Sequence, residues 1–333
     1  MRWLLRALGI VAVLALAGAG LVAWRLQDRP DLSRYARYEM SAAPPATRRP
    51  RVSVSFLGVA TLLISDGETH LMTDGWFTRV GLGDFLLQRA VSPDTDAIAR
   101  GLQRAGVTRL AAVMPVHSHY DHAQDAPDVA RRTGAILLGS ESTAWIGRGA
   151  GMREQQIRVV EPGVPTHFGK FTVTHILSKH VPLPGNAQKG PPLTAPLIPP
   201  ATVRDYPMGG AWSILIEHPL GTALVQGSAG FVPDALKGRR ADTVFLGTGA
   251  LTRQSEEYQD AYLREILDAV DAHRVIPIHY DDLFAPVGDA LVPSPALVDD
   301  VPAALDRLLR WASEEEERSF ALLPWWTPVV LFD

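Results

Sequence analysis

Residues 115–124, PVHSHYDHAQ, place three histidines and an aspartate within six positions, although the whole chain has only 10 histidines in 333 residues. In extended backbone, residues two apart point to the same side, so His117 and His119 can aim two imidazoles at one point. Asp121 and His122 follow directly and can aim at a neighbouring point. A lone histidine would be the ordinary residue of a packed core, but this density predicts a metal site.

The amino-acid composition limits the kinds of ligand that could bind such a metal. The chain has no cysteine, which excludes disulfides, thiolate metal sites and a lipoprotein anchor. Any metal must therefore be held by nitrogen and oxygen. The formal net charge is −4 at pH 7, and this balance gives no reason to expect a nucleic-acid partner, whose phosphates call for a basic surface.

The cluster directly follows the apolar run RLAAVMPV, residues 109–116, which predicts a buried strand. Strand ends and the loops after them are where α/β proteins place their chemistry. The elements that we expect around this strand are a strand at 52–58, a hairpin at 60–75 turning at Asp66-Gly67, helices at 94–106 and 125–134, strands at 135–140 and 157–162, and a hairpin at 166–177.

The second half of the chain repeats this order of elements. The expected elements are a hairpin at 212–228, a strand at 241–249, a helix at 254–273, a strand at 274–280 and a helix at 301–315. Two halves that each run from antiparallel strands to αβ units predict an α/β fold. In such a fold, two sheets pack face to face and the helices lie outside.

Residues 1–28 form a separate N-terminal piece. An uncharged apolar stretch at 7–24 follows Arg2 and Arg6, and as a helix it would rise about 27 Å, close to one hydrocarbon core. We expect a single-pass transmembrane anchor with the N-terminus in the cytoplasm and the rest of the chain outside the cell membrane. The alternative is a signal peptide cleaved at the small residues 17–19, which would leave a secreted or periplasmic protein.

The polar, proline-containing residues 29–51 predict a tether. The globular domain is expected over 52–333. Within it, residues 181–210 form a loop rich in proline and glycine that is too long for a plain connection. Leu183, Leu193 and Leu197 make it partly apolar, so we expect a lid or substrate wall for a small-molecule or lipid-like substrate. The alternative is an insertion without function.

The segment HSHYDH resembles the His-x-His-x-Asp-His motif of the metallo-β-lactamase superfamily. The resemblance extends over nearly all of 52–333, because TDG at 73–75, a later histidine and PIHY at 277–280 follow in the same order. It implies a four-layer αββα sandwich with the metals at one edge between the sheets. The segments LGVATLLIS, TDGWF and PIHYDDLF look most like the branch of ascorbate-6-phosphate lactonases and N-acyl-phosphatidylethanolamine phospholipases D.

The resemblance implies that His117 and His119 bind a first metal, whose third ligand follows the middle hairpin. That region offers both His175 and His180. His175 lies within the expected strand and could simply pack, whereas His180 lies after it, where family members place the ligand. Three neutral imidazoles and a water make a tetrahedral zinc site, although another divalent metal stays open.

The resemblance also implies a second metal, bound by Asp121 and His122 as catalytic ligands and by His279 as the distal ligand. Asp74, at the end of LMTDG, matches a family position that hydrogen-bonds a ligand histidine. The remaining histidines (His70, His167, His218 and His273) are expected at the surface or in packing.

The sequence departs from the family pattern at Ser228, which stands where family members have an aspartate that bridges the two metals. A neutral serine leaves the second site poorly compensated, so we expect one firmly bound zinc and a second, weakly bound metal. Asp281 and Asp282 could replace the missing carboxylate. Ser228 itself could contact substrate or be a simple turn residue.

These features predict a metal-dependent hydrolase that uses a metal-bound hydroxide on a phosphodiester, ester or lactone. The alternative is a non-hydrolytic metal-binding relative that lost turnover with its bridging aspartate.

Overall fold

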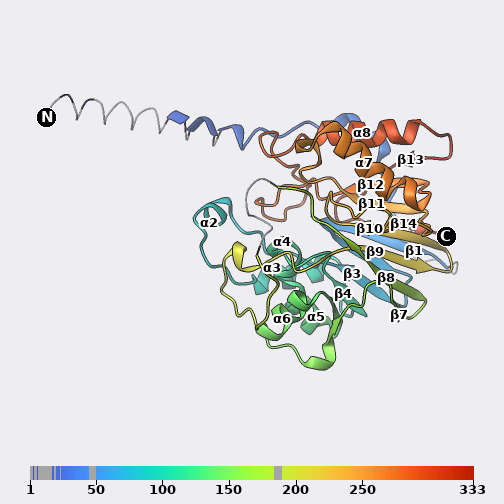
Figure 1. Cartoon of the computed structure of the whole chain (residues 1–333), viewed down its shortest axis with the longest axis horizontal. Helices are drawn as coiled ribbons and strands as arrows, with labels where there is room; N and C mark the ends of the chain where they lie inside the picture. Colours follow the sequence, from blue (N-terminus) through green and yellow to red (C-terminus); the bar gives the residue numbers. More distant parts are fainter. Residues whose placement is uncertain are drawn as a thin grey trace.

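The computed structural model describes Trp3, Arg6, Ala17, Gly18 and residues 20–22, 24–44, 50–183 and 190–333. Two β-sheets face each other, with helices on both outer sides (Figure 1). The expected mixed α/β two-sheet fold is therefore confirmed.

The first sheet has seven strands in the order β14-β1-β2-β3-β4-β5-β6. β1 to β3 are antiparallel and β3 to β6 are parallel. Asp66 stabilises the turn between β2 and β3, because its Oδ1 accepts hydrogen bonds from the backbone of Glu68 and Thr69. The strands are β14 (Val329–Phe332), β1 (Val52–Gly58), β2 (Thr61–Ser65), β3 (His70–Thr73), β4 (Ala112–Met114), β5 (Ile136–Gly139) and β6 (Ile157–Val159).

The second sheet also has seven strands and repeats the pattern, in the order β13-β12-β11-β10-β9-β8-β7. β7 to β10 are antiparallel and β10 to β13 are parallel. The strands are β13 (Ser319–Phe320), β12 (Arg274–Ile278), β11 (Thr243–Gly247), β10 (Gly221–Gln226), β9 (Ala211–His218), β8 (Phe171–Ser178) and β7 (Pro165–Phe168).

The main core lies between the sheets, and the alternation along β1 shows how the sequence builds it. Val54 and Phe56 point inward and are fully buried, whereas Ser53 and Ser55 point to the outer face. Successive side chains of a strand face opposite sides, so the period of two sets which face is apolar.

Helices cover the outer sides of the sheets (Figure 1). α3 (Thr95–Arg104), α5 (Ala126–Thr133) and α6 (Glu141–Gly149) cover the first sheet, and α7 (Glu256–Ile266) and α8 (Val301–Ser313) cover the second. Asp94 begins α3 by accepting two backbone hydrogen bonds, as an N-cap does. The short helices are α2 (Leu82–Leu86), α4 (Tyr120–Ala123), η1 (Ser33–Tyr38), η2 (Glu154–Gln156), η3 (Val203–Asp205), η4 (Leu251–Arg253) and η5 (Asp268–Val270).

Some elements differ from the sequence prediction. The helix expected at 254–273 is divided into α7 and η5, and Asp271 ends η5 in the left-handed conformation. Two further elements, α6 and β14, were not expected from the sequence. The short β14 gains its partner only when the chain end returns to pair antiparallel with β1.

Residues 29–44, called the N-terminal strap below, pack against the domain instead of forming a free tether. Tyr35 is 1% exposed, and its hydroxyl lies 2.8 Å from a carboxylate oxygen of Asp306. Arg29 forms an ion pair of 2.6 Å with the buried Asp282. Residues 29–44 of the segment expected as a tether thus contact the domain in the structure.

Among the described residues, no helix is both long and apolar enough to cross a membrane. Most of the apolar stretch at 7–24 lies outside the described residues, as do residues 45–49. The anchor expected over 7–24 therefore stays a prediction.

The strap predicts that a fragment over 52–333 is less stable than one over 29–333. Burying a large side chain such as Tyr35 stabilises a fold by about 1.5–3 kcal/mol, so we expect a loss of at least about 2 kcal/mol in the free energy of unfolding. Urea unfolding of both fragments measures it. Arg34→Ala in the longer fragment is the control, because it removes an exposed ion pair to Asp306 and a contact of the guanidinium with Tyr35 but leaves the Tyr35 side chain in place. Equal free energies for the two fragments would contradict a folded strap.

Candidate metal centre

The candidate ligands meet at one edge of the sandwich because each follows the carboxyl end of a strand. Asp74 follows β3, His117 and His119 follow β4, His180 follows β8, and His279 follows β12. Short loops after strands of both sheets thus bring together side chains that lie more than half the chain apart.

The first group consists of His117, His119 and His180, whose ligand atoms all lie within 4.8 Å of one another. Nε2 of His117 and Nδ1 of His119 are 3.0 Å apart. Two nitrogens on one tetrahedral zinc ion are about 3.3 Å apart, given bond lengths of about 2.0–2.1 Å. The three imidazoles therefore fit a single metal ion.

The orientation of His180 is fixed by the residue after it. Nδ1 of His180 lies 2.8 Å from the carbonyl oxygen of Val181, which can only accept, so Nδ1 carries the hydrogen and Nε2 keeps its lone pair. Burial, together with neighbouring histidines, lowers the pKa of His180 to about 3 and that of His119 to about 4. Both imidazoles are therefore neutral at pH 7, which is the form that binds metal.

The second group consists of Asp121, His122 and His279, whose ligand atoms also lie within 4.8 Å of one another. Oδ2 of Asp121 lies 3.4 Å from Nε2 of His122 and 3.6 Å from Nε2 of His279. Among the described residues, Nε2 of His122 is buried without a hydrogen-bond partner. A buried ring nitrogen without a partner is costly, and a metal ion would satisfy it.

Asp74 aligns His122 from behind. Its Oδ2 lies 2.7 Å from Nδ1 of His122, and both side chains are fully buried. Its Oδ1 accepts a hydrogen bond from the backbone of Val116, so both carboxylate oxygens are engaged. A carboxylate in this position fixes the tautomer of the imidazole and raises its basicity as a ligand.

Charge distinguishes the second group from the first. Burial disfavours the charged form of His122, but Asp74 and Asp121 outweigh it and raise the pKa of His122 above its usual value. Burial also opposes the charge on Asp121, yet His122 and His279 hold the pKa of Asp121 well below its usual range. The second group thus contains an ionised carboxylate, whereas the first has only imidazoles.

Two residues of the centre have unfavourable backbone conformations. Asp74 has φ of 52° and His279 has φ of 61°, in the left-handed region that side chains other than glycine rarely adopt. At Gly249, an added Cβ would lie 2.8 Å from Nδ1 of His279, so only glycine leaves room for that ring. Strain of this kind persists only where the surrounding structure fixes it.

Ser228 lies beside the first group but belongs to neither ligand group. Its hydroxyl accepts a hydrogen bond of 3.1 Å from the backbone nitrogen of Val181, next to His180. Asp281 and Asp282, the expected substitutes for a bridging carboxylate, are engaged elsewhere: Asp281 pairs with Arg79 at 2.9 Å and Asp282 with Arg29 at 2.6 Å. Their expected role as replacement ligands is therefore corrected.

His175, the other candidate third ligand, belongs to neither group. It is 2% exposed in β8 and packs near Trp212, with ring centroids 6.0 Å apart. Burial lowers the pKa of His175 to about 3. Of the two candidate third ligands, the structure places only His180 with His117 and His119.

Parts of the long loop after His180 lie beside the centre. The backbone nitrogen of Ser118, between the two ligand histidines, donates to the carbonyl oxygen of Met208 at 3.1 Å. Leu193 and Leu197 pack against an apolar cluster that contains Trp76 and Tyr120. The described part of the loop therefore forms a wall beside the ligands.

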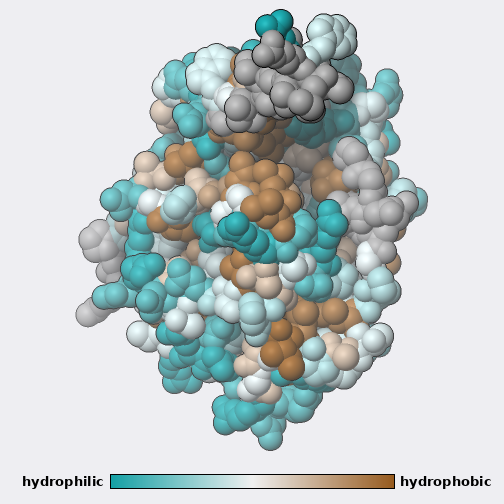
Figure 2. Space-filling view, turned by 90° about the vertical axis from the view of Figure 1, so that its left-hand side faces the viewer, coloured by the Kyte–Doolittle hydropathy of each residue, from teal (hydrophilic) through white to brown (hydrophobic). Residues whose placement is uncertain are grey.

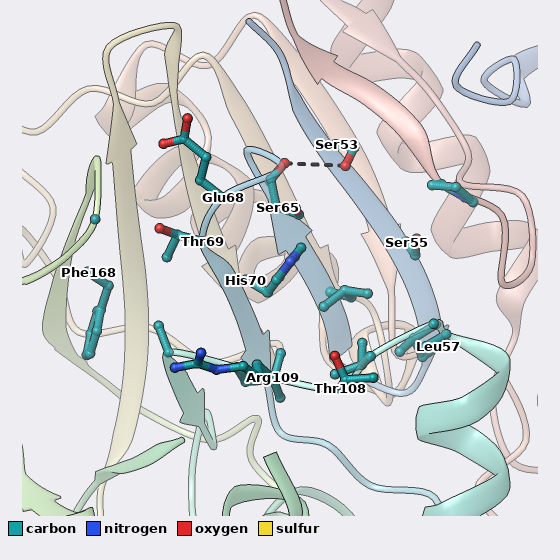
Figure 3. Close-up of a pocket in the computed structure, with 18 of the residues that line it drawn as sticks. Ser53, Ser55, Leu57, Ser65, Glu68, Thr69, His70, Thr108, Arg109 and Phe168 are labelled. Atoms are coloured by element: carbon teal, nitrogen blue, oxygen red, sulfur yellow. Dashed lines mark hydrogen bonds between the residues drawn. The ribbon is translucent and has the colours of Figure 1, made fainter. Parts of the chain in front are cut away.

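A separate polar cleft of about 960 Å³ lies on the outer face of β1 to β3. Figure 3 shows Ser53, Ser55, Ser65 and His70 along the strands and Arg109 beside them. None of the candidate ligands lines it. His70 at the start of β3 and Leu57 near the end of β1 both line this cleft, so it extends along the outer face of these strands.

The two-sheet fold resembles that of several solved proteins. A "possible metal-dependent hydrolase" from Veillonella parvula DSM 2008 matches with a TM-score of 0.51 and 14% identity, over 85% of this chain and 100% of that one. An isothiocyanate hydrolase from Delia radicum gut bacteria matches with a TM-score of 0.50 and 14% identity, over 84% and 100%. YhfI from Bacillus subtilis, described as a metallo-beta-lactamase fold protein, matches with a TM-score of only 0.43 and 14% identity, over 69% of this chain and 86% of that one.

CmlA, a diiron β-hydroxylase from Streptomyces venezuelae, matches with a TM-score of 0.50 and 14% identity, over 86% of this chain and 55% of that one. The same fold thus occurs in hydrolases and in an iron enzyme, so it does not identify the metal. No protein-family model and no curated protein sequence matches the chain.

The buried state of His175 predicts a pH-dependent stability. An unfolded histidine has a pKa of about 6.5, and the folded value is about 3, so below pH 6.5 only the unfolded chain takes up this proton. The stabilising contribution of neutral His175 to the free energy of unfolding is therefore lost as pH falls, by about 1.4 kcal/mol per pH unit down to about pH 3. In metal-free protein, His175→Phe should gain about 2 kcal/mol relative to wild type between pH 7 and pH 5.

Urea unfolding at the two pH values measures this difference. His167→Phe is the control because His167 is exposed in the adjacent strand β7, and it should show no pH-dependent gain. The same pH dependence in His175→Phe as in wild type would contradict a neutral, buried His175.

Proposed function

We propose that the protein is a metal-dependent hydrolase acting on a phosphodiester, ester or lactone. The observation that carries the proposal is the adjacency of the two ligand groups: the rings of His117 and His122, one from each group, have centroids 4.0 Å apart. Two neighbouring cation sites of this kind suit reactions in which water attacks an electrophilic centre and negative charge develops on an oxygen.

Each residue has a distinct part in the proposed reaction. A bound cation would lower the pKa of water and attract the developing negative charge. His117, His119 and His180 would hold the first cation through neutral nitrogens. Asp121 would supply the negative charge that the second cation needs. Asp74 keeps His122 aligned throughout, because the hydrogen bond between them is buried.

We propose zinc as the metal of the first group. Three imidazole nitrogens and an open position are typical of catalytic zinc sites. The proposal that the protein belongs with the ascorbate-6-phosphate lactonases and N-acyl-phosphatidylethanolamine phospholipases D is supported by the segments LGVATLLIS, TDGWF and PIHYDDLF.

A second candidate function is that of a metal-binding protein without turnover. The neutral side chain of Ser228 favours it, because Ser228 brings no charge to the position expected for a bridging carboxylate. Asp281 and Asp282, which could have replaced that carboxylate, are paired with arginines. The hydrolase remains the better-supported proposal, since all five histidines that it requires lie in the two groups.

Metal content and activity test the proposed function together. We expect the wild type to hold one zinc ion firmly in the first group and a second weakly, because Ser228 brings only a dipole where a carboxylate would bring a charge. Ser228→Asp should raise the content from about one metal per chain toward two. His180→Ala should remove the firmly held metal and all hydrolysis of phosphodiester, ester and lactone substrates.

Zinc titration and native mass spectrometry measure the content, and His175→Phe is the matched control that should keep both metal and activity. Two tightly held metals in the wild type would refute the charge argument. Firm zinc binding with no hydrolysis of any of these substrates would favour the non-hydrolytic alternative.

We also propose that the protein is membrane-bound through residues 7–24 and takes an amphiphilic substrate from the bilayer. Leu86 and Leu87, at the end of α2, are 66% and 64% exposed, and Ile198 in the long loop is 70% exposed. α2 lies on the side from which the described N-terminal residues extend (Figure 1), and apolar patches are visible on that side (Figure 2). Phe85 connects α2 to the centre, because its ring centroid lies 6.2 Å from that of Tyr120 and 5.2 Å from that of Phe284.

The apolar end of α2 predicts a chain-length effect. Leu86→Ser with Leu87→Ser should lower activity on long-chain substrates in vesicles several-fold more than activity on short, soluble ones, because only the former requires contact with the bilayer. Val164→Ser, which alters an exposed apolar residue near β7, is the control.

Equal losses on both kinds of substrate would refute a membrane contact of α2. The intact mass of protein extracted from membranes tests the anchor itself. A mature chain that begins near residue 20 would contradict the anchor and leave the secreted or periplasmic alternative.

A further inference from the structure

The loop that carries His279 is held by an unusual backbone arrangement. The backbone nitrogen of His279 donates a hydrogen bond of 2.7 Å to the carbonyl oxygen of Val59, in the turn between β1 and β2. Val59 has φ of 54° and Gly58 has φ of 114°. Left-handed backbone is a genuine outlier for a β-branched residue such as valine. Two strained residues, Val59 and His279, are thus bonded directly to each other.

A buried carboxylate fixes this strained pair. Oδ1 of Asp281 accepts a hydrogen bond of 2.8 Å from the backbone nitrogen of Val59, so the two segments are joined by hydrogen bonds in both directions. Oδ2 of Asp281 pairs with Arg79 at 2.9 Å. The side chains of Asp281 and Arg79 are 3% and 4% exposed, so the ion pair is dry.

Arg79 is itself fixed on its other sides. Its guanidinium lies over the ring of Trp76, 4.7 Å from the centroid, and donates to the carbonyl oxygen of Asp282 at 3.4 Å. A Cβ at Gly58 would lie 2.3 Å from the guanidinium, so the turn leaves room for Arg79 only because residue 58 is a glycine. Trp76 and Arg79 belong to the loop that begins at Asp74, and the network therefore connects the loops of Asp74 and His279.

We propose that Asp281 and Arg79 are positioning residues that hold the His279 imidazole in the second ligand group. They do so by fixing the left-handed backbone at Val59 and His279, which would otherwise relax. The role of His279 as a ligand rests on the proposed function, whereas its fixed position does not. An ion pair replaced by neutral groups of similar volume is often tolerated, so the essential part is the oxygen that accepts from Val59.

The test compares two double variants that differ only in that oxygen. Arg79→Met with Asp281→Asn removes both charges but keeps an acceptor for the Val59 nitrogen. Arg79→Met with Asp281→Leu removes the charges and the acceptor in a side chain of similar size. Asp282→Asn is the matched control, because it changes a neighbouring buried carboxylate that does not bond to Val59.

Cobalt(II) titration of the full chain, followed by absorption spectroscopy, measures affinity for each ligand group. We expect the Asp281→Leu double variant to lose at least about tenfold in affinity at the second group, as changes to residues that orient ligands typically do. The cobalt affinity of the first group should stay within about threefold of the wild-type value. The Asp281→Asn double variant and Asp282→Asn should have wild-type affinities at both groups. Equal loss at both groups would overturn the proposal, because it would indicate general destabilisation.

Ring nitrogen NMR of the metal-free chain provides a readout that does not depend on metal binding. The His279 resonances should move and broaden in the Asp281→Leu double variant and be unchanged in its Asp281→Asn counterpart. If wild type binds no second cobalt ion but this difference is seen, the second metal group fails and the positioning role stands. Unchanged His279 resonances in the Asp281→Leu double variant would overturn the positioning role.

Discussion

Five histidines can share a largely buried edge only if most of them stay uncharged, and much of the centre follows from this requirement. Burial lowers the pKa of His117, His119 and His180, so the first group presents neutral nitrogens. His122 is the exception, because Asp74 and Asp121 raise its pKa. The carboxylates of Asp74 and Asp121 therefore both lie beside His122, whereas the first group contains no carboxylate.

The repeated order of strands explains why so many ligands meet at one place. Each half of the chain runs from antiparallel to parallel strands, and each sheet thereby directs strand ends to the same edge. His117 and His119 come from the first sheet, whereas His180 and His279 come from the second. The first group therefore cannot form unless both sheets have packed together, which couples metal binding to the completed core.

The residues that could be predicted from sequence are those whose pattern is local. The spacing of His117, His119, Asp121 and His122 follows from alternation and from short-range turns, and the strands around them show clear apolar patterns. Choosing His180 over His175 required a family resemblance, because the two histidines lie only five positions apart, at and just after the end of the same hairpin.

The contacts that could not be predicted are those between distant segments. Strap residues Arg29 and Arg34 pair with Asp282 and Asp306, and the backbone of Val59 bonds to Asp281. Each of these contacts joins residues more than 200 positions apart. The polar composition of residues 29–44 predicts a linker, because nothing in the local sequence shows that Tyr35 contacts Asp306. With the strap in place, only residues 25–28 separate the apolar stretch from Arg29, whose partner Asp282 lies three positions after His279. The five steps from residue 24 to residue 29 reach at most about 18 Å. In an anchored molecule, Arg29 and the domain it contacts would therefore stay close to the bilayer. Such a molecule would meet substrates only in the layer of solution next to the membrane.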